Sequence, residues 1–512
     1  MLSAVYSAGL CGIEGFPVIV ECNQRERLEG FDLVGLPDLA VKEAKERVWN
    51  ACHNSGYPFP YSKITVNLAP ADRRKEGSGF DAAILTAIFH SSGVIRRDVD
   101  LKGRCIVGEL SLSGELRPVR GILCMCAAAM EHGFREFYAP RENAREAASV
   151  QGITVYAVEN MRQLVRHLNG EELLRPVETD QTLFDAVNRY TVDFSDVRGQ
   201  TMAKRAMEIA AAGGHNVLLI GPPGTGKSML AKRLPTILPP LSFAEAIEST
   251  KVHSVAGVLP EGHSLLAVRP FRAPHHTMSA PSLVGGGVTP MPGEVSLANN
   301  GVLFLDELPE FPKQVTDALR QPLEDRRVTI SRANGRVSFP CSFMLVGAMN
   351  PCRCGYFGHP SRKCTCRPDD VRRYVSRISG PLLDRMDIQI ELPSLSYEEI
   401  STPNATAERS EVIRERVTRA RAFARARMGE GSRVFCNAQL DAAGIHEFCT
   451  TDTDAQKLLA AAYDRLGLSA RGYDRVLRVA RTVADLDESE VIRAKHVAEA
   501  LQLRSLDRKY WG

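Results

Sequence analysis

Residues 217–228 read VLLIGPPGTGKS. The apolar run Val217–Ile220 predicts a short buried strand, and the next eight residues have the spacing Gly-x-x-x-x-Gly-Lys-Ser. Glycines at these places let backbone N–H groups turn towards phosphate oxygens, and the N-terminus of the following helix adds a positive partial charge. The stretch therefore predicts a strand, a phosphate-binding loop and a helix within an α/β fold.

The residues of this loop have expected roles in binding ATP and Mg²⁺. Lys227 is expected to reach the terminal phosphates, and the Ser228 hydroxyl is placed to ligate Mg²⁺. A glycine-rich loop with an unrelated lysine is the alternative, and the apolar run in front of it argues against that. The predicted ATP-binding residues are Gly221, Pro222, Pro223, Gly224, Thr225, Gly226, Lys227 and Ser228.

Two further apolar runs end in polar residues of the kind that a nucleotide site needs. Val302–Leu305 ends in Asp306 and Glu307, expected to hold Mg²⁺ through water and to polarise the attacking water, respectively. Phe343–Met349 stops at Asn350, which we expect to orient that water beside the γ-phosphate. Taken alone, the acidic pair also suits a solvated turn and the asparagine a turn former.

Composition sets the broad class. A chain of 512 residues, 44% of them hydrophobic and 24% charged, should form about three globular domains. The net charge of +3 means that contacts with nucleic acid must come from local patches. We expect a cytoplasmic protein with no membrane segment, because no signal peptide or long apolar run is present. The 13 cysteines then indicate reduced thiols or metal ligands.

The pattern of apolar residues divides the chain into four parts. Residues 1–170 read as an α/β unit, 171–192 as a linker, 193–395 as the nucleotide-binding core and 396–512 as a helical lid. Individual expected elements are a strand at Lys63–Leu68, an amphipathic helix at Phe80–His90, a helix at Ile122–His132, an arginine-rich helix at Glu408–Met428 and a final helical stretch at Asp485–Leu503.

The core resembles a AAA+ ATPase of the Mg-chelatase-like branch. The resemblance rests on the phosphate loop, Asn350 as a first sensor, and the segment SGPLLDR at Ser379–Arg385. It implies that Arg385 is an arginine finger completing a neighbour's site in a ring, and that Arg471 is a second sensor, with Arg475 one helical turn away as the other candidate. Otherwise these arginines form local ion pairs or a solvated helix face. The catalytic set is then Lys227, Asp306, Glu307, Asn350, Arg385 and Arg471.

Two insertions refine the branch. Ser282–Glu294 looks like the helix-2 insert of the MCM and Mg-chelatase branches. Val328–Phe339 alternates about Asn334-Gly335, a hairpin turn signal, at the place where MCM helicases carry a hairpin before the first sensor. Arg332 and Arg336 near its tip are the predicted DNA contacts, through phosphates and without sequence preference. A basic solvated hairpin is the alternative.

A cysteine cluster follows the first sensor, within residues 350–368. The four thiols form two Cys-x-Cys pairs separated by nine residues, which suits a tetrahedral zinc site. Unligated thiols are the alternative, and His359 is a reserve ligand. The histidine pair His275-His276 has an expected structural or channel-facing role. The predicted zinc ligands are Cys352, Cys354, Cys364 and Cys366, with Arg353, Arg362, Lys363 and Arg367 making the segment basic.

The N-terminal unit resembles the Lon-protease-type domain through GELSLSGELRPV at Gly108–Val119. A Ser-Lys protease needs a lysine amine to deprotonate its serine. Ser78, in KEGSGFD, is shifted from the protease pattern, and Arg120–Cys124 contains no lysine. We therefore expect a scaffold or a DNA-facing collar that lacks the Ser-Lys dyad.

Over nearly the whole chain, domain order, Cys-x-Cys pairs and SGPLLDR resemble the ComM/YifB family of Mg-chelatase-like AAA+ ATPases. The resemblance implies a homohexameric ring that acts as a helicase on branched or single-stranded DNA, promoting branch migration during recombination in natural transformation. A Mg-chelatase-like or MoxR-like ATPase that remodels a protein complex is the second hypothesis. An ATP-dependent protease is the third.

Overall fold

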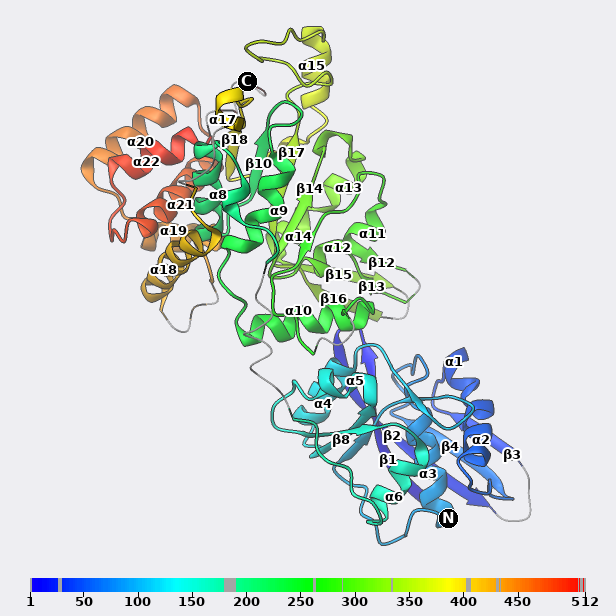
Figure 1. Cartoon of the computed structure of the whole chain (residues 1–512). Helices are drawn as coiled ribbons and strands as arrows, with labels where there is room; N and C mark the ends of the chain where they lie inside the picture. Colours follow the sequence, from blue (N-terminus) through cyan, green and yellow to red (C-terminus); the bar gives the residue numbers. More distant parts are fainter. Residues whose placement is uncertain are drawn as a thin grey trace.

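The computed structural model describes residues 2–510 apart from 26–29, 179–189, 261–263, 288, 333–334, 402–406, 430–431, 433, 505 and 507–509. Figure 1 shows an elongated molecule with the N-terminal domain in blue and cyan at one end. The α/β core, in green, and the helical lid, in orange and red, lie together at the other end. This is the mixed α/β architecture predicted from the sequence.

The N-terminal domain is built on a seven-stranded mixed sheet in the order β3-β4-β2-β1-β5-β8-β9. The predicted strand at Lys63–Leu68 is β4, one residue longer. Beyond β9, the backbone N–H of Val177 donates to the carbonyl of Val155 at 2.8 Å, so the first part of the expected linker pairs with the sheet edge. The strands are β1 (Leu2–Cys11), β2 (Glu14–Arg25), β3 (Gly30–Val34), β4 (Lys63–Ala69), β5 (Arg104–Ile106), β8 (Glu136–Pro140) and β9 (Thr154–Val158), with a separate pair β6 (Glu109–Leu110) and β7 (Leu116–Arg117).

Helix α3 (Asp81–Ser92) differs from the amphipathic helix expected at Phe80–His90. All of its residues except His90 and Ser92 are buried. The helix packs on β1 and β2 on one side and on α2 (Ala44–Asn54) on the other, so it has no broad solvent face. A helix that is apolar all round is typical of such a central position. The other helices of this domain are α1 (Leu39–Lys42), α4 (Ile122–Glu131), α5 (Arg141–Ala147) and α6 (Met161–Leu168).

The core is a five-stranded parallel sheet in the order β11-β14-β17-β10-β18. Every residue of β10, β14 and β17 is buried, as continuous apolar runs predict for strands covered on both faces. The strands are β10 (Val217–Ile220), β11 (Phe271–Arg272), β14 (Val302–Leu305), β17 (Met344–Met349) and β18 (Ile388–Glu391). The helices are α8 (Thr201–Gly213), α9 (Lys227–Ile237), α10 (Phe243–Ala256), α13 (Lys313–Ala318), α14 (Arg320–Asp325), α15 (Pro368–Val375) and α16 (Gly380–Leu383).

Both predicted insertions are present. The segment Ser282–Glu294 falls within α11 (Ala280–Val284), a small hairpin of β12 (Gly285–Gly286) and β13 (Met291–Pro292), and α12 (Glu294–Leu297). The second hairpin is β15 (Arg327–Arg332) and β16 (Gly335–Pro340). Here Gly335 pairs with Arg332, so Gly335 belongs to β16 and not to the expected turn at Asn334-Gly335. Residues 333–334 and the side chain of Arg332 lie outside the described residues.

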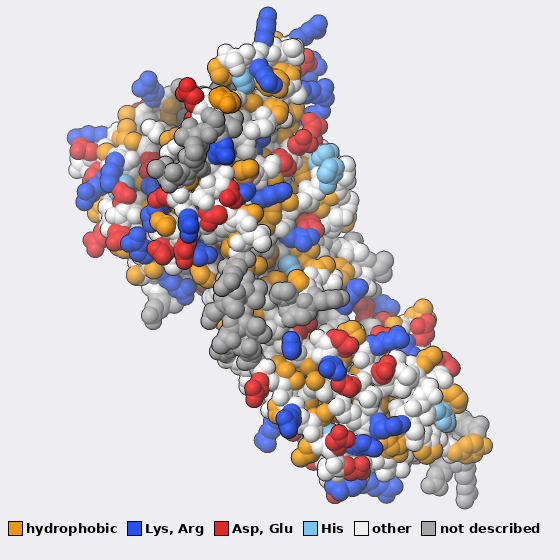
Figure 2. Space-filling view, viewed as in Figure 1, with side chains coloured by type: hydrophobic (Ala, Val, Ile, Leu, Met, Phe, Trp, Pro, Cys, Tyr) orange, Lys and Arg blue, Asp and Glu red, His pale blue; other side chains and the backbone are white. Residues whose placement is uncertain are grey.

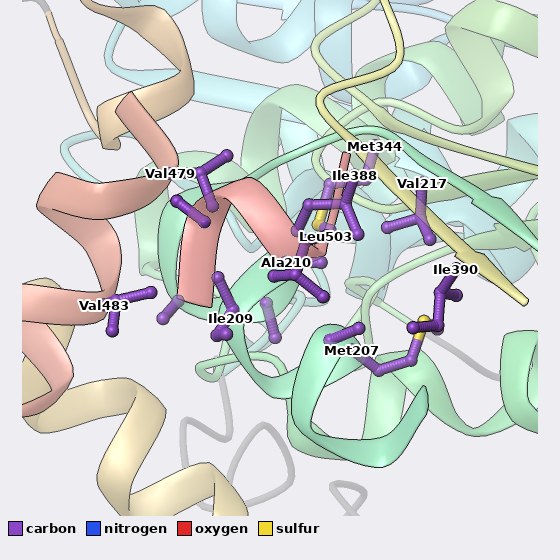
Figure 3. Close-up of a cluster of buried hydrophobic side chains, with 14 of the residues drawn as sticks. Met207, Ile209, Ala210, Val217, Met344, Ile388, Ile390, Val479, Val483 and Leu503 are labelled. Carbon is purple, nitrogen blue, oxygen red and sulfur yellow. The ribbon is translucent and has the colours of Figure 1, made fainter. Parts of the chain in front are cut away.

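The lid is all helical and is joined to the core by one continuous apolar cluster. Figure 3 shows Ile209 and Ala210 of α8 near Val479 and Val483 of α21, with the strand residues Ile388 and Val217 to their right. The expected helical stretch at Asp485–Leu503 is two helices, because α21 ends at Leu486 and α22 begins at Ala494. The lid helices are α17 (Tyr397–Ser401), α18 (Ser410–Met428), α19 (Ala442–Phe448), α20 (Thr453–Leu466), α21 (Ala470–Leu486) and α22 (Ala494–Gln502).

Among the described residues, the N-terminal domain contacts the core at α10 and at the β15–β16 hairpin. At α10, the backbone N–H of Gly121 donates to the carbonyl of Ser254 at 3.2 Å, and the Ser254 hydroxyl donates to the buried carboxylate of Glu146. At the β1–β2 turn, Gly12 has φ +63, and a Cβ there would lie 2.2 Å from Cγ1 of Val337 in β16. The turn therefore rests directly on the hairpin of the core. No helix among the residues described is long and apolar enough to cross a membrane.

We predict that Asp485→Ala destabilises the lid by about 3–5 kcal/mol, because it leaves buried guanidinium groups without their carboxylate partner. Asp485 is 1% exposed and accepts from Arg427 at 2.5 Å and from Arg481 at 3.1 Å. The matched control is Asp454→Ala, which removes an exposed pair with Lys457 and should change stability by less than about 0.5 kcal/mol. Denaturant unfolding followed by circular dichroism measures both, and equal effects would contradict the prediction.

Candidate nucleotide-binding site

The phosphate loop follows β10 and leads directly into α9, which begins at Lys227. Gly224 and Gly226 have φ of +81 and +91, a backbone conformation that favours glycine. The Thr225 hydroxyl donates to the carbonyl of Pro222 at 2.9 Å and closes the loop. Loop and helix thus take the form that the sequence predicts for binding phosphates.

Lys227 lies inside this loop. Its Nζ donates to the carbonyl oxygens of Gly221 at 2.6 Å and Pro222 at 2.8 Å. Burial lowers the pKa of Lys227 to about 8, while the nearby Asp306 and Glu307 act in the opposite direction. An amine held at the centre of a loop of backbone groups is suited to bind phosphate oxygens, so the donor set fits ATP.

The carboxyl ends of β10, β14 and β17 bring the other predicted residues to this loop. The Ser228 hydroxyl donates to Oδ2 of Asp306 at 2.7 Å, which places side by side two oxygen atoms of the kind that can hold Mg²⁺. Asn350 follows β17, and its Oδ1 accepts from Nζ of Lys227 at 3.1 Å. These four side chains form one cluster, although they come from three separate strands.

Glu307 has an unusual backbone. Its φ of +51 and ψ of +45 lie in the left-handed region, which is costly for a residue with a Cβ and is most often seen at functional sites. Its N–H donates to Oδ1 of Asp306 at 3.0 Å, and its side chain is 57% exposed. The carboxylate therefore projects from the edge of the sheet into the space beside the loop.

One neighbour of Glu307 was not predicted. Nδ1 of His276 lies 3.6 Å from Oε2 of Glu307, and the His276 ring packs against Phe311. The sequence predicts a structural or channel-facing role for the His275-His276 pair. The two rings lie close together, with centroids 4.1 Å apart, and Nδ1 of His275 is 2.9 Å from Oγ1 of Thr277. The strand order explains the contact, because β11, which precedes His276, pairs with β14, which precedes Glu307.

Arg385 lies at the amino ends of the strands, opposite the carboxyl ends that carry its own phosphate loop. It precedes β18, and its carbonyl accepts from Asn216, which precedes β10, at 2.9 Å. Since the two strands are parallel, both residues are at amino ends, and β10 alone spans about 13 Å between them and the loop. The guanidinium pairs with Glu324.

The two candidates for the second sensor also lie near the amino ends of the strands. In α21, Arg471 and Arg475 approach Asp384 at 3.8 and 3.5 Å. The Arg471 side chain is 76% exposed, whereas that of Arg475 is 6% exposed. Both border a cavity of about 360 Å³ together with Arg385, Arg326 and Arg478. The arginine candidates thus share one surface cavity that is remote from the loop of the same chain.

The four predicted zinc ligands come together between β17 and α15. All four Sγ atoms lie within 4.8 Å of one another. Cys352 and Cys354 are 3.3 Å apart, and Cys364 is 3.7 and 3.5 Å from them. Although its burial acts in the opposite direction, hydrogen bonds from the backbone N–H groups of Tyr356 and Thr365 lower the pKa of Cys354 to about 6. Clustered sulfurs with a readily formed thiolate fit a tetrahedral metal site.

In the N-terminal domain, the Ser78 hydroxyl donates to the carboxylate of Glu109. Lys75 is fully buried, and its Nζ donates to the carbonyl oxygens of Pro70 and Arg73. Among the hydrogen bonds of the described residues, none joins the amine of Lys75 to Ser78. Lys75 and Ser78 are thus held by different partners.

The fold and this loop define a P-loop ATPase of the AAA+ class. Sequence profiles described as magnesium chelatase subunit ChlI, subunit ChlI of Mg-chelatase, and ChlI C-terminal match residues 193–400, 20–143 and 407–504. The chain is 43% identical to the competence protein ComM of Haemophilus influenzae and 41% identical to the uncharacterized protein YifB of Escherichia coli, each over 99% of its length and 98% of theirs.

The chain therefore belongs to the ComM/YifB family of Mg-chelatase-like AAA+ ATPases. A Lon protease of Methanosarcina barkeri is 26% identical over 144 residues, which are 27% of this chain and 17% of that protein. That likeness agrees with the Lon-type form expected for the N-terminal domain.

We predict that Glu307→Gln keeps nucleotide binding and lowers kcat for ATP hydrolysis by about 100-fold or more, because the amide cannot take a proton from water. The control is Glu310→Gln, since Glu310 lies three residues away and pairs with Arg377 at 2.8 Å. It should hydrolyse ATP at the normal rate. Steady-state hydrolysis with fluorescent-nucleotide binding separates the outcomes, and an unchanged kcat for Glu307→Gln would contradict the assignment.

Proposed function

We propose that the chain is a ring-forming, ATP-dependent DNA motor whose ATP sites lie between neighbouring subunits. The observation that carries this proposal is the position of Arg385, Arg471 and Arg475 at the amino ends of the strands, on the far side of the sheet from the loop. An arginine placed there serves a phosphate held by another subunit. A closed ring satisfies every such site, and a homohexamer is the form we propose.

Within each site, the residues of this chain divide the work. The phosphate loop from Gly221 to Ser228 binds the phosphates, and Ser228 and Asp306 hold Mg²⁺, which neutralises phosphate charge when bound. Glu307 accepts the proton of the attacking water, and Asn350 orients that water. The neighbour contributes Arg385, and Arg471 as the more exposed sensor candidate.

DNA is the proposed substrate of the motor. The support is a set of exposed basic side chains on the β15–β16 hairpin and around α15. It is joined by the similarity to a protein named for competence. Arg336 is exposed on β16. Figure 2 shows Lys and Arg side chains projecting from the end of the core where Figure 1 places α15. The exposed basic residues of this segment are Arg353, Arg362, Lys363, Arg367, Arg372 and Arg373.

We propose branch migration during recombination, including that of natural transformation, as the reaction this motor drives, and the cytoplasm as its location. ATP hydrolysis moves the β15–β16 hairpin, which holds a strand through Arg332 and Arg336. Such phosphate contacts act without sequence preference and weaken with salt. We also propose Zn²⁺ at the four clustered cysteines, where a closed thiolate set gives it a structural role.

The intersubunit site is tested by mixing two inactive variants. Lys227→Ala removes the phosphate contact and Arg385→Ala removes the finger, so neither protein alone should hydrolyse ATP. In an equal mixture that exchanges subunits, about one quarter of the sites pair an intact loop with an intact finger, and that share of activity should return. A mixture that stays inactive despite proven exchange would show that the site is not shared.

The DNA assignment is tested with Arg336→Ala. This variant should keep its basal ATPase rate, lose most of the stimulation by branched DNA, and lower the salt dependence of DNA binding by about one counterion. The control is Arg327→Ala at the base of the same hairpin, where the side chain is 3.3 Å from Ser338. If the wild-type ATPase ignores DNA, a protein complex becomes the client instead.

A further inference from the structure

The loop that carries the four cysteines, residues 350–367, contacts the phosphate loop and is called the cysteine loop below. Gly355, between Cys354 and Tyr356, has φ +83, and a Cβ built there would lie 2.6 Å from Cδ and 2.9 Å from Cγ of Pro223. Only a glycine permits so close an approach of backbone to ring. Pro223 belongs to the predicted ATP-binding loop, so the backbone of the cysteine loop contacts the phosphate loop directly through the Pro223 ring.

Two more contacts tie the cysteine loop to the same region. At its start, Cys352 comes two residues after Asn350, which holds Nζ of Lys227 at 3.1 Å. Cys352 is fully buried in an apolar cluster with Leu218 and Ile220 of β10. The phosphate loop and the cysteine loop therefore grow from neighbouring strands over one core.

The third contact joins the cysteine loop to the segment before α17. Nε2 of His359, within the cysteine loop, lies 2.8 Å from Oγ of Ser394. The segment before Ser394 runs along the phosphate loop, because the N–H of Leu392 donates to the carbonyl of Ile220 at 2.7 Å. A Cβ on Gly221 would lie 2.6 Å from the carbonyl oxygen of Leu392. The phosphate loop is thus bounded by the cysteine loop and by the segment to which that loop is attached.

The cysteine loop has no helix or strand of its own between β17 and α15. It has local hydrogen bonds of its own, such as Arg362 Nη1 to the Tyr356 hydroxyl at 2.7 Å, and its shape depends also on what joins its sulfurs. A divalent ion bound by four thiolates supplies a rigid tetrahedral link between the two Cys-x-Cys pairs. Without it, four neighbouring thiols attract one another weakly, and nearby thiolates repel.

We propose that a thiolate-bound metal ion, Zn²⁺, at Cys352, Cys354, Cys364 and Cys366 clamps the phosphate loop in the form that binds nucleotide. The inference rests on the proposed ATP site and adds that nucleotide affinity at this site depends on the bound metal ion. Loss of the metal frees Gly355 from Pro223 and relaxes the hold of Asn350 on Lys227. Nucleotide affinity then falls, although the sheet and the lid remain folded.

The test uses the full-length protein and two readouts that do not require hydrolysis. Metal content is measured by mass spectrometry, and affinity is measured with a fluorescent ADP analogue. The wild type should carry one Zn²⁺ per chain, and the double variant Cys364→Ser/Cys366→Ser should carry none and bind the analogue at least tenfold more weakly, with unchanged circular dichroism. Cys11→Ser, which changes an exposed cysteine outside the cluster, should match the wild type in both readouts.

A second variant tests the contact without touching the sulfurs. Gly355→Ala should keep its Zn²⁺ and still lose affinity, because the methyl group pushes against Pro223. Metal loss with unchanged affinity, or full affinity in Gly355→Ala, would overturn the clamp while leaving the nucleotide site intact. A wild-type protein that binds no nucleotide would instead overturn the proposed ATP site, so the two failures are distinguishable.

Discussion

The site depends on the parallel order of three neighbouring strands, β14, β17 and β10. Carboxyl ends of adjacent parallel strands meet at one edge, so the residues that follow them meet as well. The contacts of Ser228 with Asp306 at 2.7 Å and of Lys227 with Asn350 at 3.1 Å are the result. Because these strands are buried on both faces, a change of register would disrupt the packing on both sides of the sheet and separate the site residues.

This constraint explains which features the sequence could predict. An apolar run that ends in a polar residue is a local pattern, and Asp306 and Asn350 are found in this way. The phosphate loop has a spacing that few other structures require, and the Cys-x-Cys pairs carry their own chemistry. The parallel arrangement then converts three local patterns into one cluster without any further information.

Features that depend on contacts between distant elements could not be found in this way. His276 meets Glu307 because β11 is the edge neighbour of β14, and a strand of two residues leaves no readable period. Helix α3 is buried on two sides, by α2 and by the sheet, instead of having the solvent-exposed face that an amphipathic helix would have. The contact of Gly12 with Val337 joins two domains, and nothing near Gly12 in the sequence points to β16.

Contacts between elements that are distant in the sequence connect the parts of the proposed motor. The cysteine loop borders the phosphate loop, the N-terminal domain rests on the β15–β16 hairpin, and Arg385 lies at the amino ends of the strands. The most direct test of the central claim is a structure of the assembled protein with a non-hydrolysable ATP analogue and DNA. We predict that the Arg385 guanidinium leaves Glu324 and lies within hydrogen-bond distance of the γ-phosphate of the adjacent subunit's nucleotide. A structure in which Arg385 stays on Glu324, with no neighbour near its cavity, would contradict it.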